Sequence, residues 1–222
     1  MDAQRVSALI GRCEGQRYLR RWLPILALLV PTAMTAASLE EFGTEMSYFY
    51  VAPSAAKFVE FQQQANELEA ELTATGSIGD LLVAVMAARI AEKHGWPLEE
   101  SFFKDAAAAV LDEDTELGQF VRDDDYVNPT KLDIWWGSFF ATGEAQYLEK
   151  LLRFAGEEMP KDDIFAMSVV GAATWSFRSN CAQHEAVLNF AIETSESDSV
   201  SDAKRAFLVE TIEYARARAD QR

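Results

Sequence analysis

The sequence is poor in the residues that build metal centres and disulfides. Its 222 residues include two cysteines, Cys13 and Cys181, and two histidines, His94 and His184. A structural zinc site takes four cysteine or histidine ligands, and only one cysteine lies beyond residue 37. The sequence also lacks a glycine-rich phosphate loop, a nucleophile elbow and a dinucleotide fingerprint. We therefore expect no metal and no cofactor, and we expect stability to come from a packed core.

Positive charge is scarce as well. The chain carries 36 acidic and 20 basic residues, for a formal net charge of -16 at pH 7. A field of this sign repels phosphate backbones and anionic lipid surfaces. We therefore expect no nucleic-acid partner, and we favour a protein or peptide partner with basic character.

An apolar run near the N-terminus is too short to cross a bilayer. Trp22–Met34 has 13 residues, whereas a spanning helix needs about 20. Five arginines precede the run and small residues follow it, which is the order of a secretory signal peptide. We predict a signal peptide at residues 1–37 and a periplasmic or secreted domain at residues 38–222. An uncleaved anchor, which would add a membrane as a partner, and a buried core helix are the alternatives.

Beyond residue 37, apolar residues recur at helical spacing. Leu132, Trp135, Trp136 and Phe139 lie three or four residues apart, and Gly143 supplies a stop before a second apolar helix. This spacing predicts two helices packed as a hairpin, around which the rest of the chain is organised. The fold class predicted is all-α, a single domain of antiparallel helical hairpins.

Several residues predict where helices begin and end. Asparagine and aspartate favour helix starts, proline suits the first turn, and glycine favours helix ends. The predicted starts are Pro97, Asn128-Pro129 and Asp162 or Asp163, the predicted end is His94-Gly95, and the predicted break is Ser179-Asn180.

Two helical hairpins can be overlaid at an offset of 37 residues. The overlay pairs Gly143 with Asn180, and both residue types tolerate a left-handed turn. A period near 37 lies in the range of tetratricopeptide-like or solenoid-like repeats, although the diagnostic tetratricopeptide pattern is absent. A real repeat and a chance similarity between two hairpins are both left open.

Three segments resemble those of a known family. They are SYFYVAP at 47–53, LDIWWGSFFATGEAQYLEKLL at 132–152 and ATWSFRSNCAQHEAVL at 173–188, and the stretch that ends in FFATG is the most specific. The chain resembles a family of small, exported, all-helical bacterial proteins that have no established activity. The resemblance implies export and a helical fold, and it implies no catalytic residue.

Cys181 and His184 are the strongest candidates for chemistry. If Asn180 caps a helix that begins at Cys181, the helix dipole favours a thiolate there. His184, three residues on, would share its face and act as the base. Against this hypothesis, free cysteine is among the most buried residue types, and the sequence indicates no third catalytic group. An exported hydrolase that uses this pair or an acidic site is therefore the alternative function.

The acidic segment at 112–128 is a second candidate. Asp112, Asp114 and Glu116 alternate as a calcium loop would begin, but Gly118 falls at the seventh position and not at the sixth. A solvated acidic loop is the interpretation we favour.

The aromatic residues indicate binding more than catalysis. Most should lie in the core, but Trp135 and Trp136 point about 100° apart on a helix, so one of them can face a groove. We predict that Trp136, Trp175 and Arg178 contribute to a binding surface. The leading hypothesis is a non-catalytic, exported helical binding or scaffold protein that holds a protein or peptide partner.

Overall fold

The computed structural model describes residues 38–74 and 78–220 and is all-helical over these ranges, which confirms the predicted fold class. The signal peptide and its alternatives concern residues 1–37, which lie outside the described residues. In chain order the elements are α2 (Leu39–Ser47), the 3-10 helix η2 (Phe49–Val51), α3 (Ala55–Glu67), α4 (Glu69–Leu72), α5 (Gly79–His94), α6 (Lys104–Leu111), α7 (Glu116–Arg122), α8 (Pro129–Thr142), α9 (Ala145–Leu152), α10 (Ile164–Cys181), α11 (Glu185–Glu196) and α12 (Asp202–Ala219).

Side-chain caps begin most of the longer helices. Ser38 and Glu41 form a capping box at α2, and Asn128 caps α8, where Pro129 occupies the first turn. Each cap satisfies a backbone N–H that has no partner within its own helix. Further caps are Ser54, Thr115, Asp163 and Ser201. The predicted starts at Asn128 and Asp163 are therefore confirmed.

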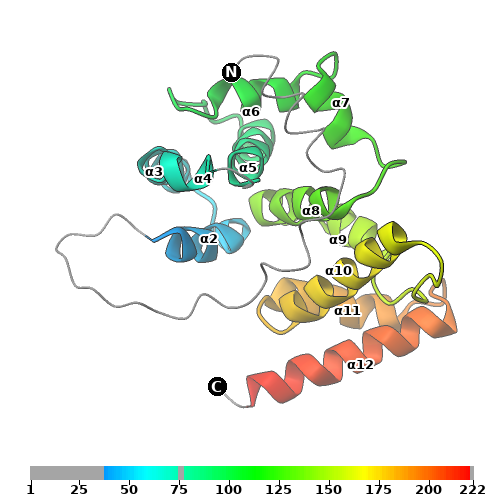
Figure 1. Ribbon diagram of the computed structural model, residues 1–222. Helices are drawn as coiled ribbons and strands as arrows, with labels where there is room; N and C mark the ends of the chain where they lie inside the picture. The colour runs from blue at the N-terminus through cyan, green and yellow to red at the C-terminus, as the bar shows by residue number, and fades with distance from the viewer. Residues whose placement is uncertain (1–37, 75–77, 221–222) are drawn as a thin grey trace.

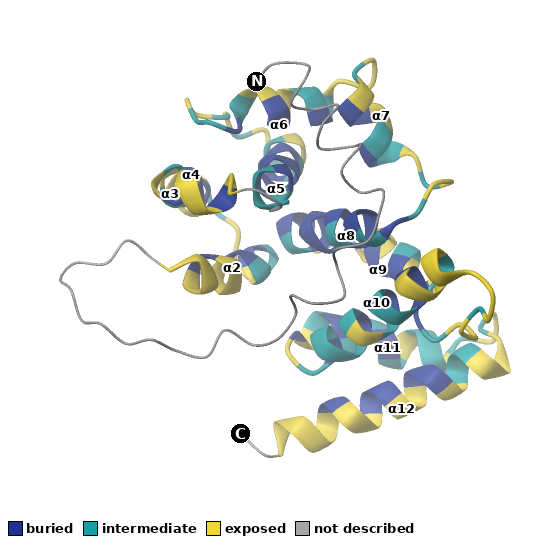
Figure 2. Ribbon diagram, viewed as in Figure 1, coloured by how far each residue is buried: buried dark blue, intermediate teal, exposed yellow. Residues whose placement is uncertain are grey.

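Helix α8 lies at the centre of the arrangement (Figure 1) and is buried along most of its length (Figure 2). Ile134 and Ala141 belong to one apolar core, which the helices from α2 to α7 form. The opposite sides of α8 contribute to a second core with α9 to α12, through Leu132, Trp135, Trp136 and Phe139. One helix therefore joins both cores into one domain, as the predicted organisation around residues 132–154 requires.

The predicted helix start at Pro97 is wrong, because α6 begins only at Lys104. Two side chains of α3 bind the backbone of the segment before it. Gln62 accepts a hydrogen bond from Glu99 N at 2.7 Å and lies 3.5 Å from Pro97 O. The Asn66 side chain donates to Glu100 O and accepts a hydrogen bond from Phe102 N. These amides satisfy backbone groups that a helix would otherwise pair, so the segment is held in an irregular path.

The turn after α8 matches its prediction, but the turn after α10 does not. Gly143 ends α8 in the left-handed conformation with φ 69°. Asn180 lies inside α10, and its side chain donates to Ser176 O at 2.9 Å. Asn180 is the last but one residue of α10, so the break predicted at Ser179-Asn180 is present but lies two residues later, at residues 182–184. The turn match that suggested a repeat is absent, and the tetratricopeptide-like or solenoid-like repeat stays a prediction.

The segment between α9 and α10 is held by contacts from distant helices. Lys204 of α12 donates to Leu152 O at 2.8 Å and to Ala155 O at 2.6 Å, which satisfies carbonyls at the end of α9. Gly156 has φ 73°, and its N–H donates a hydrogen bond to Thr174 Oγ1 of α10 at 2.9 Å. These bonds hold the chain that leaves α9 against α10 and α12. Among the described residues, no helix is both long and apolar enough to cross a bilayer.

Candidate functional site

The premise for a reactive Cys181 is wrong. Cys181 is the last residue of α10, not the first residue of a helix. The carbonyl end of a helix disfavours negative charge. The side chain is 2% exposed, and burial raises the pKa of the Cys181 thiol to about 12. The thiol is therefore neutral at physiological pH, with its sulfur 3.7 Å from Val187 O.

His184 is buried among aromatic rings and is a weak base. It occupies the N-cap position of α11, and its ring centroid lies 4.4 Å from that of Tyr48 and 5.0 Å from that of Phe140. Burial lowers the pKa of His184 to about 4, so its imidazole is neutral. The contact between Tyr50 Oη and His184 Nδ1 is 3.4 Å, and Tyr48 donates to Gln183 O at 2.8 Å. These contacts hold the segment around η2 against the turn between α10 and α11.

Cys181 therefore offers no thiolate, and His184 offers only a weakly basic imidazole, so nothing in this pair favours a hydrolase.

The acidic segment at 112–128 folds as a turn followed by α7. Asp112 Oδ1 accepts a hydrogen bond from Asp114 N, and Thr115 caps α7. Gly118 is required there because an added Cβ would lie 1.9 Å from Asp112 O. Within the ranges described, no group of three or more histidine, cysteine, aspartate or glutamate side chains is placed to hold a metal ion.

The three residues predicted to bind a partner have different surroundings. Trp136 is 6% exposed, and its Nε1 donates to Ser176 Oγ at 3.0 Å, so it lines the core and not an open groove. Arg178 pairs with Glu210 at 3.1 Å and lies over the Phe207 ring. Trp175, in contrast, is 68% exposed. Of the three, only Trp175 presents a large apolar surface to solvent.

Trp175 belongs to a longer exposed surface. Ile164, Met167 and Trp175 lie at helical spacing on one side of α10 and are all exposed, Ile164 to 80%. Figure 2 shows the first turns of α10 as exposed. We call this surface the apolar face of α10, and its members are Ile164, Met167, Gly171 and Trp175, with Met159, Phe165 and Tyr126 beside them.

Neighbouring segments extend the apolar face of α10. Phe165 stacks on Tyr126, with ring centroids 6.2 Å apart. Met159 Cε would lie 3.8 Å from a Cβ at Gly171. Exposed acidic residues lie within three residues of Tyr126, Met159 or Ile164 along the chain, namely Asp123, Asp125, Glu157, Glu158, Asp162 and Asp163, and Glu157 pairs with Lys204 at 2.6 Å. An apolar strip with an acidic border is complementary to a segment that has apolar side chains flanked by basic ones.

Sequence reasoning missed most of this face. The sequence pointed to Trp175 but not to Ile164 and Met167, because α10 is apolar nearly all round. In the structure Val169, Val170 and Ala173 are buried, whereas Ile164 and Met167 are exposed. Periodicity identifies a buried side only when the other side is polar.

Comparisons with known proteins add no relative. No protein-family model matches the chain, no curated protein sequence matches it, and no solved structure matches it. The resemblance to exported helical bacterial proteins therefore stays a prediction, and function is argued from the residues themselves.

Proposed function

We propose that the protein is an exported, non-catalytic binding or scaffold protein that holds a protein or peptide partner on the apolar face of α10. The observation that carries the proposal is Trp175, a large aromatic side chain that is 68% exposed beside exposed Ile164 and Met167. Tryptophan is among the residues most enriched at the energetic centres of interfaces. The partner segment would present apolar side chains to α10 and lysine or arginine to its acidic border.

Site-specific cross-linking in the native host tests this proposal. A photoreactive phenylalanine analogue replaces Trp175 in one strain and Tyr214 of α12 in another, since Tyr214 is also an exposed aromatic. We expect a discrete cross-linked protein from position 175 alone, identified by mass spectrometry. Equal products from both positions, or none from position 175, would contradict the proposal.

Truncation of Trp175 should weaken binding of that partner strongly. Removal of a central interface tryptophan costs about 2 kcal/mol or more, so Trp175→Ala should raise the Kd by a factor of about 30. Tyr214→Ala should leave the Kd unchanged. Titration calorimetry measures the Kd of the wild type and of both variants. A higher salt concentration should raise the wild-type Kd, because the acidic border is exposed and salt screens its charge.

Export is the second part of the proposal, and the order of residues 1–37 supports it. We expect the protein recovered from the envelope or medium of its host to begin close to Ser38. Intact-mass analysis decides this directly. A mass that starts at Met1 would instead support an uncleaved N-terminus.

A further inference from the structure

Residues 1–37, which we call the leader segment, have the chemistry that the apolar face of α10 would bind. Five arginines against Asp2 and Glu14 give the leader segment a formal charge of +3, and all of these charges precede residue 22. The apolar run at 22–34 follows them, and no charged residue occurs from Trp22 to Leu39. A basic stretch joined to an apolar run is the complement of an apolar strip with acidic charge at one end.

The acidic charge of the apolar face of α10 lies at its N-terminal end. Residues 157–163 hold four acids and one base, Lys161, and Lys204 pairs with Glu157 at 2.6 Å. Four carboxylates against these two cations leave a charge of −2 there. Asp125 lies close by, since it precedes Tyr126, whose ring stacks on that of Phe165. Residues 164–177 of α10 carry no charge, so the acidic end and the apolar part follow each other as the basic and apolar parts of the leader segment do.

The described chain begins on the side of the opposite end of α10. Figure 1 shows α2 on the side of the molecule where α10 ends. Tyr48, which follows α2, donates to Gln183 O at 2.8 Å, and its ring centroid lies 4.4 Å from that of His184. A segment that continues from Ser38 onto α10 therefore meets Trp175 before it meets the acidic end. In this direction the apolar run comes first and the arginines come last.

The leader segment is long enough to follow this path. The path runs along α2 to Tyr48 and then from Gln183 along α10 to Ile164, and at 1.5 Å per helical residue it measures at most about 50 Å, including the contact between them. The 16 residues from Trp22 to Ser38 span up to about 55 Å when extended. A segment tethered over such a distance has an effective concentration of about 1 mM. A contact with a Kd of about 0.1 mM would therefore be about 90% formed.

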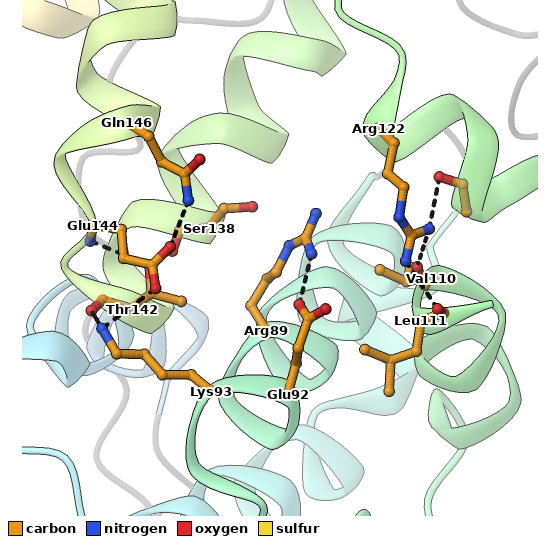
Figure 3. A network of polar contacts seen from close by, with 11 residues as sticks. Arg89, Glu92, Lys93, Val110, Leu111, Arg122, Ser138, Thr142, Glu144 and Gln146 are labelled. Atoms are coloured by element: carbon orange, nitrogen blue, oxygen red, sulfur yellow. Dashed lines mark hydrogen bonds and ion pairs between the residues drawn. The ribbon is translucent and has the colours of Figure 1, made fainter. Parts of the chain in front are cut away.

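The cavity between α5, α7, α8 and α9 does not offer the same complement. Arg89, Lys93, Glu92 and Glu144 lie together at this cavity (Figure 3). Both carboxylates are already paired, Glu92 with Arg89 at 2.7 Å and Glu144 with Lys93 at 3.6 Å. Further arginines would therefore meet cations and paired carboxylates there, whereas Glu158, Asp162 and Asp163 before α10 have no ion-pair partner within the described part of the chain.

We propose that the leader segment of the uncleaved chain occupies the apolar face of α10. Residues 22–34 cover Ile164, Met167 and Trp175, and the arginines lie at the acidic end. One consequence rests on the proposed function: the face is free for a partner only after the leader segment has been removed during export. Occupancy by the leader segment does not require that partner, so it is tested on the purified full chain alone.

Photo-cross-linking of the purified 222-residue chain tests the contact. A photoreactive phenylalanine analogue replaces Trp175 in one sample and Tyr214 in the other, where Arg218 lies over the Tyr214 ring. We expect position 175 to link to residues 22–34, identified by peptide mass spectrometry, and position 214 to form no such link. A mixture of isotope-labelled and unlabelled chains distinguishes a link within one chain from a link between copies, and we expect both linked peptides to carry the same label.

Variants of the leader segment test the apolar and the charged parts separately. Leu26→Asp combined with Leu29→Asp should lower the yield of the link at least fivefold, because charged side chains would enter the apolar contact. Arg20→Glu combined with Arg21→Glu should lower the yield at least threefold. Glu158→Lys combined with Asp162→Lys, added to the arginine variant, should restore the yield because opposite charges face each other again. The buried residues of both cores lie at 42–215, so thermal unfolding should show each variant folded.

The proposal is overturned if position 175 links to no residue of the leader segment, or if position 214 links to it equally. It is also overturned if the linked peptides carry different labels, which would assign the face to a second copy, or if the lysine variants do not restore the yield. Its failure is separable from failure of the proposed function. A host protein captured at position 175 by the chain that begins near Ser38, without any link in the full chain, would contradict this inference alone. A link in the full chain without a captured host protein would contradict the proposed function alone.

Discussion

Replacement of Gly156 by alanine should destabilise the protein by about 2 to 5 kcal/mol. Gly156 has φ 73°, a conformation that costs an L-residue about 1 to 2 kcal/mol. An added Cβ would lie 2.2 Å from Phe207 Cγ and 2.7 Å from Phe207 Cβ, and overpacking of this kind costs about 1 to 3 kcal/mol more. Phe207 packs on Phe177, so the variant should displace α12 from α10. Urea denaturation measures the change.

Gly43→Ala and Gly171→Ala are the controls for this prediction. Gly43 lies inside α2 with nothing within 4 Å of an added Cβ, and Gly171 lies inside α10 with Met159 Cε at 3.8 Å. Because both positions lie in a helix interior, each replacement by alanine should raise the free energy of unfolding by about 0.5 to 1 kcal/mol. A Gly156→Ala protein as stable as these two would show that the turn at residue 156 can rearrange at little cost.

Asp133→Asn should stabilise the protein increasingly as pH rises. Burial raises the pKa of Asp133 to about 7, against about 3.9 in an unfolded chain. The folded state therefore binds the proton more tightly, and wild-type stability falls as pH rises from about 4 to about 7. Asparagine has nearly the shape of the neutral acid and does not ionise. Its advantage should grow by about 2 to 3 kcal/mol between pH 5 and pH 8.

The pH experiment needs an internal comparison because His184 acts in the opposite sense. The pKa of His184 is lowered to about 4 by burial, so its contribution is complete above about pH 6.5 and is lost as pH falls from there. The difference between Asp133→Asn and wild type cancels that contribution, because both proteins contain His184. Asp162→Asn removes an exposed charge as the control. If the stability difference between Asp133→Asn and the wild type stays constant from pH 5 to pH 8, the pKa of Asp133 is not raised in the folded protein.

Local signals in the sequence were sufficient for the helices and for their centre. Asn128, Pro129 and Gly143 act through bonds within a few residues of themselves, so the start and end of α8 follow from residue type. The aromatic spacing in α8 also placed its large side chains in the core, because a helix that is apolar nearly all round must be covered on every side.

Only the tertiary structure decided the candidate sites. The irregular path before α6 depends on Gln62 and Asn66, which lie some 35 residues earlier. The exposed side of α10 and the neutral state of Cys181 likewise depend on which distant helices pack there. Local propensity is set by neighbours along the chain, whereas exposure, ionisation and cavity shape are set by neighbours in space.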